Sequence, residues 1–162
     1  MQKMSFFGIG PKIGIILIPW LVVTITISLI TGMFSYTSGE KTYLVLSGAI
    51  LLIVGLIFYF SSVRLLLNGL KSGKLVTSGT FSLCQNPLYV SFIFFLIPAI
   101  SLLINSWMVL ITCIAGYIPL KMFIKDEYRE LEKYFGDEYL KYRAETPEFF
   151  PFPVKKWFGK KR

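Results

Sequence analysis

Three long stretches without a charged residue constrain the fold of this chain more than any other feature of its sequence. They cover residues 13–39, 42–63 and 75–120. A helix of about 20 apolar residues crosses a bilayer core of about 30 Å, so the first two stretches each fit one crossing and the third fits two. The mean hydropathy of +0.64 is also too high for an ordinary soluble domain of 162 residues. We therefore predict an all-α integral membrane protein.

The sequence predicts about four transmembrane helices, at residues 13–34, 42–63, 88–104 and 107–122. The last two share the longest uncharged stretch, in which Asn105-Ser106 is the polar break near the middle and the predicted hairpin turn. Both arms of this hairpin are short. A re-entrant hairpin that does not fully cross the bilayer is therefore an alternative to two crossings.

Basic residues gather near particular ends of the predicted spans. The segment 64–74 and the C-terminal region are rich in lysine and arginine, whereas the turn at 105–106 has neither. The positive-inside rule then places both termini and residues 64–87 in the cytoplasm, and the cell membrane is the expected location if the chain is prokaryotic. This topology and anionic lipid account for the net charge of +8. No nucleic-acid-binding motif accompanies the charge, so no nucleic-acid partner is predicted.

The chain contains no histidine, which narrows its possible chemistry. Metal sites that need imidazole and triads built on histidine are excluded. Cys84 and Cys113 are isolated and form no CxxC pair, so neither a metal centre nor a structural disulfide is predicted. Any catalysis must run without an imidazole, and the sequence does not name a catalytic residue.

The C-terminal region is charged but still patterned, and it predicts a cytosolic amphipathic helix at about 123–145. One aromatic face of this helix is formed by residues at three- and four-residue spacing, namely Tyr128, Leu131, Phe135, Tyr139 and Tyr142. Glu127 lies on or beside that face, and Gly136 is expected to kink or divide the helix. With no internal repeat or low-complexity linker, residues 1–162 are predicted to form a single domain.

Three short motifs fall on the predicted cytoplasmic side. They are KLVTSGTF at 74–81, NPLY at 86–89, and Glu127 with the aromatic helix face. Each is weak alone, because a Ser-Gly-Thr turn is common and Asn-Pro is a frequent helix start with Asn as the N-cap. An aromatic helix face is also more often packing than a cofactor site.

Together, in this order and spacing, LVTSGTFSLCQNPLYV and EYRELEKYFGDEYLKYRAETPEFFP resemble the isoprenylcysteine carboxyl methyltransferase and phospholipid methyltransferase superfamily. The resemblance covers residues 64–153. Its more specific half is the second motif, where the residues in register are Leu131, Phe135, Gly136, Tyr139, Tyr142 and Pro147.

The resemblance implies a multi-span helical methyltransferase that binds S-adenosylmethionine in a cytosolic pocket closed by the C-terminal helix. Carried over by position, the cofactor-binding residues are Lys74, Leu75, Val76, Phe81, Asn86, Pro87, Leu88, Tyr89 and Glu127. A carboxylate such as Glu127 accepts charge-assisted hydrogen bonds, and aromatic rings attract a sulfonium cation. Methyl transfer to a carboxylate or thiolate needs in-line approach and exclusion of water more than acid–base help.

The chain departs from the family pattern at several positions. Gln85-Asn86 stands where the family has Arg-His, and Tyr128 replaces the second acid of its acidic pair. Phe123 stands where the isoprenylcysteine enzymes have an arginine that holds the substrate carboxylate, so it is the predicted substrate position but does not specify a carboxylate.

We therefore predict methyl transfer from S-adenosylmethionine to a lipophilic or lipid-linked acceptor, with a carboxylate, thiol or amine headgroup, at the cytoplasmic membrane face. One alternative is a non-catalytic membrane scaffold that keeps the fold, suggested by the changes at Gln85-Asn86 and Phe123. A nicotinamide-dependent reductase is a further alternative, although the glycines form no GxGxxG phosphate-binding motif.

Overall fold

The computed structural model describes residues 9–149, and all regular structure within that range is helical. The elements are α1 (Gly10–Thr31), α2 (Thr42–Ser72), α3 (Thr80–Leu83), α4 (Pro87–Val90), the π-helix η1 (Ser91–Leu96), α5 (Ile97–Leu103), the 3₁₀ helix η2 (Trp107–Leu110), α6 (Ile111–Phe135) and α7 (Asp137–Glu145). The predicted all-α class is confirmed for these residues.

Three helices are long and apolar enough to cross a membrane. They are α1, α2 and the continuous helix Trp107–Phe135 formed by η2 and α6. The fourth predicted span corresponds to Pro87–Leu103, which runs through α4, η1 and α5 and is shorter. At about 1.5 Å per residue it extends over roughly 25 Å, slightly less than a bilayer core of about 30 Å.

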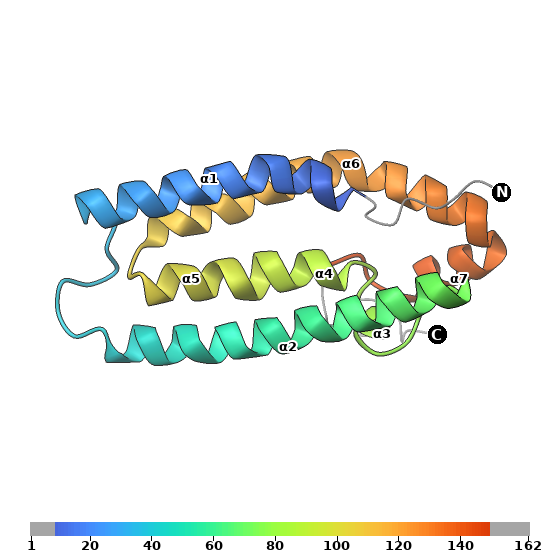
Figure 1. Ribbon diagram of the computed structural model, residues 1–162, viewed down its shortest axis with the longest axis horizontal. Coiled ribbons are helices and arrows are strands. Elements are labelled where there is room, and N and C mark those ends of the chain that lie inside the picture. Colours follow the sequence, from blue (N-terminus) through green and yellow to red (C-terminus); the bar gives the residue numbers. More distant parts are fainter. Residues whose placement is uncertain (1–8, 150–162) are drawn as a thin grey trace, which may run out of the picture.

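The helices form two groups that run side by side (Figure 1). Helix α1 packs along α6, and α2 packs along the segment formed by α4, η1 and α5. The loop between α1 and α2 and the turn before η2 lie at one end of the molecule, whereas α3 and α7 lie at the other end. The elements that carry the sequence motifs are therefore gathered at a single end.

Helix α2 packs closely because small residues occupy its inner face. Its buried residues recur every seven positions, at Gly48, Gly55, Ser62 and Gly69. A Cβ atom on Gly55 would lie 2.7 Å from Cβ of Phe95 and 2.9 Å from Cδ2 of Leu96. A heptad of small residues keeps one face toward the neighbouring helix and lets the two backbones approach.

The end of the bundle away from α7 is joined by hydroxyl and amide groups. Oγ1 of Thr24 and Oγ1 of Thr112 are 3.2 Å apart, and Ser106 donates to Ser28 at 2.7 Å. The predicted hairpin turn is confirmed, since Asn105 adopts a left-handed φ of 56° and its side-chain amide donates to the carbonyl oxygen of Thr37 at 2.7 Å. These bonds satisfy polar groups that are costly to bury alone.

The C-terminal helix differs from its prediction at its start, whereas the expected division at Gly136 is confirmed. No helix begins at 123, because α6 runs without interruption from Ile111 to Phe135. The first charged residue of α6, Lys121, marks where the helix becomes polar, and helical hydrogen bonding continues regardless of polarity. The division lies at Gly136, whose φ of 55° separates α6 from α7.

Candidate functional site

A cavity of about 1060 Å³ lies between the two helix groups and extends to α7. All nine residues predicted to contact the cofactor line this cavity: Lys74, Leu75, Val76, Phe81, Asn86, Pro87, Leu88, Tyr89 and Glu127. Phe123, the predicted substrate position, is not among the lining residues, and Nζ of Lys12 lies 5.8 Å from the centre of its ring. The structure thus brings three separate motifs onto one surface but leaves Phe123 apart from it.

The cavity has an apolar part and a polar part. Ile13 and Leu17 of α1 and Leu66 of α2 contribute to the apolar wall, which reaches into the charge-free portion of the bundle. Near α7 the wall contains carboxyl, amide and phenol groups. A cavity of this kind suits a ligand with a polar end and a hydrophobic end.

Glu127 and Glu130 both line the cavity, and Glu127 is the less exposed of the two. Glu127 is partly buried in the charged portion of α6, beyond the uncharged segment that ends at Leu120. Tyr89 donates a hydrogen bond to its Oε2 atom over 3.3 Å. Within residues 9–149 no lysine or arginine forms an ion pair with it.

The environment of Glu127 makes its charged form less favourable than that of a carboxylate in water. Burial raises the pKa of this carboxyl, and the backbone of Ile9 and the hydrogen bond from Tyr89 oppose that rise only in part. A cationic group of a ligand would supply the missing charge partner. The carboxyl is therefore positioned to bind a cation.

Two neighbouring hydrogen bonds join α4 to α6 across the polar end of the cavity. One is the bond from Tyr89 to Glu127, and the other runs from Nδ2 of Asn86 to the hydroxyl of Tyr128 at 2.6 Å. Asn86 is the N-cap residue of α4 and Pro87 its first helical residue, as the sequence indicated, but the side chain of Asn86 makes no capping bond. The side-chain amide of Asn86 instead donates to groups far away in the sequence.

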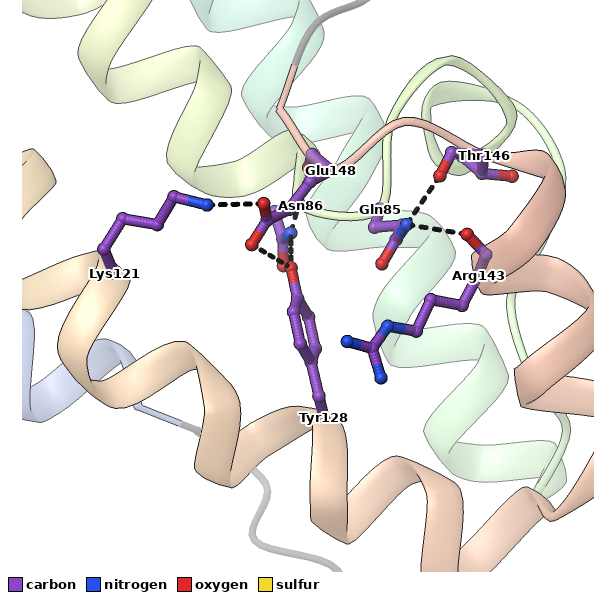
Figure 2. A network of polar contacts seen from close by, with 7 residues as sticks. All are labelled: Gln85, Asn86, Lys121, Tyr128, Arg143, Thr146 and Glu148. Carbon is purple, nitrogen blue, oxygen red and sulfur yellow. Dashed lines mark hydrogen bonds and ion pairs between the residues drawn. The ribbon is translucent and has the colours of Figure 1, made fainter. Parts of the chain in front are cut away.

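Asn86 belongs to a network that fastens the segment after α7 (Figure 2). Its Nδ2 atom also donates to the carbonyl oxygen of Glu148 at 3.0 Å. The carboxylate of Glu148 accepts from Tyr128 at 3.1 Å and from Nζ of Lys121 at 2.5 Å. The charged side chain of Glu148 is therefore fixed from both α4 and α6.

Gln85, the residue before Asn86, also holds the segment after α7. Its Nε2 atom donates to the carbonyl oxygens of Arg143 and Thr146, at 3.2 and 2.5 Å, and its backbone N–H donates to Pro147 at 2.9 Å. We call residues 143–148, which these bonds hold, the C-terminal strap. Sequence reasoning missed this function of Gln85-Asn86, since no local signal links the pair to partners about 60 positions away.

The other predicted residues are held by the backbone around them. The turn after α2 starts at Gly73, with a φ of 63°, and brings Lys74-Leu75-Val76 back against α2. A Cβ atom on Gly69 would lie 2.2 Å from Cγ2 of Val76, so only glycine permits this approach. The hydroxyl of Tyr142 donates to the carbonyl oxygen of Phe81 at 2.7 Å, which ties α3 to α7.

The cysteines do not add a reactive group to the site. Cys84 is completely buried, and burial raises the pKa of its thiol to about 11, so it is not a thiolate at neutral pH. Across the described residues, no three side chains of the His, Cys, Asp and Glu types are placed to hold a metal ion.

No protein-family model, no curated protein and no solved structure matches this chain. The chemistry of the site therefore has to be inferred from its own residues.

Proposed function

We propose that this chain is an integral membrane methyltransferase, which uses S-adenosylmethionine to methylate a lipophilic acceptor at the cytoplasmic face. The observation that carries the proposal is the convergence of three motifs, separated by up to about 50 positions, on one cavity. A resemblance in sequence alone would not require the turn at 74–76, the NPLY segment and Glu127 to share a surface.

The proposed topology has four crossings and both termini in the cytoplasm. It is supported by the gathering of charged residues at the end that contains α3 and α7, and by their absence from the opposite turn at 105–106. The shorter segment Pro87–Leu103 would cross if the bilayer thins locally to match it, which costs little per ångström. The polar part of the cavity would then open to the compartment that contains the cofactor.

The residues of the cavity fit this cofactor. S-adenosylmethionine supplies an electrophilic methyl group on a sulfonium and also carries an ammonium. The carboxyl of Glu127, which has no cationic partner among residues 9–149, suits such a cation, and the rings of Phe81 and Tyr89 line the same cavity. The volume of about 1060 Å³ is at the upper end for a small-molecule site and leaves room for an acceptor.

The protein would contribute orientation and shielding more than acid–base catalysis. The bonds that join α4 to α6 hold the wall of the polar end together, so that a bound cofactor and acceptor would replace water around the reacting groups. The apolar wall formed by Ile13, Leu17 and Leu66 suits the hydrophobic part of an acceptor. Approach of that acceptor in line with the methyl group is the main requirement for its transfer.

A non-catalytic scaffold is the second candidate, and one observation favours it. The side-chain amides of Gln85 and Asn86 form structural bonds to the strap and to Tyr128, so these departures from the family pattern serve the fold. A scaffold, however, gives no reason for a cavity in which the carboxyl of Glu127 has no cationic partner within residues 9–149.

Transfer of a labelled methyl group tests the proposal. Membranes containing this chain, incubated with S-adenosylmethionine labelled in its methyl group, are expected to accumulate label in the organic-solvent extract with time. Membranes of the same host without the chain provide the background. Label that stays at background, although the purified chain binds S-adenosylhomocysteine, would contradict the transferase and favour a scaffold that retains the ligand site.

A further inference from the structure

The hydroxyl of Tyr139 is exceptional among the tyrosines at the polar end of the cavity. Tyr139 is 1% exposed, lines the cavity, and packs between Tyr128 and Tyr142, with ring centroids 6.4 and 6.5 Å away. Both neighbours use their hydroxyls, one with Asn86 and Glu148 and the other with the carbonyl of Phe81. The Tyr139 hydroxyl has no hydrogen-bond partner among the residues that the structure describes.

The side-chain oxygen of Gln85 is a second buried polar atom without a hydrogen-bond partner in the part of the chain that the structure describes. The Nε2 atom of Gln85 faces two carbonyl oxygens, which fixes the amide orientation and directs Oε1 away from them. Oε1 is buried and has no hydrogen-bond partner within residues 9–149. Buried polar groups without a partner are rare and unfavourable, so two in one cavity wall require an explanation.

Gln85 and Tyr139 both line the cavity and are connected through α7. Gln85 binds the carbonyl oxygen of Arg143, which follows Tyr139 by one helical turn on the same face of α7. Figure 2 shows the Gln85 amide beside the backbone of Arg143.

The two atoms call for complementary partners. An amide oxygen accepts hydrogen bonds and cannot donate them, so it needs an N–H or O–H group from the ligand. Burial raises the pKa of Tyr139 to about 12, so its hydroxyl stays protonated at neutral pH and can donate to a ligand acceptor. The matching group is neutral and carries a donor beside an acceptor.

We propose that Gln85 Oε1 and the Tyr139 hydroxyl bind the amino-pyrimidine edge of the cofactor adenine, where an N–H donor and a ring nitrogen acceptor lie side by side. This assignment rests on the proposed function. It divides the cavity by chemistry, with the cationic part of the cofactor at Glu127, the neutral base at α7, and the acceptor toward the apolar wall.

Tyr139→Phe tests the contact because it removes only the oxygen atom. Calorimetry on the detergent-purified full chain is expected to show S-adenosylhomocysteine binding weakened about fivefold to tenfold. The thermal unfolding temperature of the ligand-free protein is expected to stay the same or rise, because a buried unpartnered hydroxyl is lost. Tyr43→Phe, an exposed tyrosine at the start of α2, is the matched control and should change neither quantity.

A second ligand identifies the part of the cofactor involved. S-inosylhomocysteine presents a carbonyl and an N–H where adenine presents an amino group and a ring nitrogen. It should bind wild type more weakly than S-adenosylhomocysteine, and Tyr139→Phe should add little to that loss, since interacting groups give non-additive effects. Fully additive losses would place the hydroxyl away from the base, for example against the ribose, and would overturn the proposal.

The remaining outcomes separate this proposal from the proposed function. If wild type binds S-adenosylhomocysteine and Tyr139→Phe binds it equally well, the adenine contact is wrong and the methyltransferase proposal stands. If Tyr139→Phe lowers the unfolding temperature of the free protein, the hydroxyl is structural and the contact is wrong. If folded wild type binds neither ligand, the proposed function fails and this contact fails with it.

Discussion

Glu127→Gln is expected to weaken binding of S-adenosylhomocysteine by about 10-fold to 100-fold, the largest effect on ligand affinity that we predict. The ligand carries an ammonium group, and the carboxyl of Glu127 has no cationic partner within residues 9–149. A hydrogen bond to a charged group contributes about 1.5–3 kcal/mol, which corresponds to this range of affinity. Calorimetry on purified wild type and variant measures the difference.

The same substitution should not destabilise the protein at neutral pH. Because burial raises the pKa of Glu127 above its value in the unfolded chain, the folded state holds this proton to higher pH than the unfolded state does. The contribution of this carboxyl to stability therefore falls as the pH rises from its unfolded-state pKa through its higher folded-state pKa. Glutamine is neutral at every pH, so Glu127→Gln should unfold at the same temperature as wild type or higher at pH 7.

Glu132→Gln is the matched control on the same helix. Glu132 is exposed and does not line the cavity, and the substitution makes the same change of charge. It should bind as wild type does. Equal affinity of the Glu127 and Glu132 variants would contradict the assignment of Glu127, and a fall in the unfolding temperature of Glu127→Gln would show that the carboxyl is chiefly structural.

Asn86→Ala is expected to lower the free energy of unfolding by about 2–3 kcal/mol. Asn86 is 7% exposed and donates both to the hydroxyl of Tyr128 and to the carbonyl oxygen of Glu148. Alanine removes both bonds and leaves a buried carbonyl without its partner. The loss can be measured by thermal or denaturant unfolding in detergent.

The Asn86 substitution should also loosen the strap before the bundle unfolds. Trypsin cleavage after Arg143 is expected to become faster, because the network that fixes Glu148 loses one of its members. Asn68→Ala is a suitable control, since Asn68 is exposed on α2. An Asn86 variant as stable and as protease-resistant as the Asn68 variant would show that the strap does not depend on this amide.

Much of the fold could be predicted because single residues carry strong physical signals. Uncharged stretches mark apolar helices, and α1 and α2 begin close to their predicted positions. A polar pair in a long apolar stretch marks a turn, and Asn105 tolerates the left-handed conformation found there. Gly136 likewise adopts a positive φ that separates two helices.

The boundaries and tertiary partners could not be predicted in the same way. The change from apolar to charged residues near Lys121 indicates where α6 becomes polar, but α6 continues to Phe135. The motif around Gln85 and Asn86 indicated a polar site. Its bonds to the strap depend on how α7 folds back, and nothing local encodes that arrangement.

The sequence could predict which residues form the candidate site, but it could not predict how all of them are arranged. The nine predicted residues do line one cavity. Phe123 was chosen by its position relative to Glu127, yet residues four apart on a helix share a face only approximately, and its ring lies near Lys12. Tyr139 was predicted as part of an aromatic face, and only its missing hydrogen-bond partner within residues 9–149 distinguishes it from its neighbours.

The central claim is that the cavity binds S-adenosylmethionine, and direct calorimetry of wild-type protein tests it. The detergent-purified chain is expected to bind S-adenosylhomocysteine with a dissociation constant on the order of micromolar, and S-adenosylmethionine should compete for the same site. Absence of binding by protein that shows a cooperative thermal unfolding transition would contradict the account and favour the scaffold.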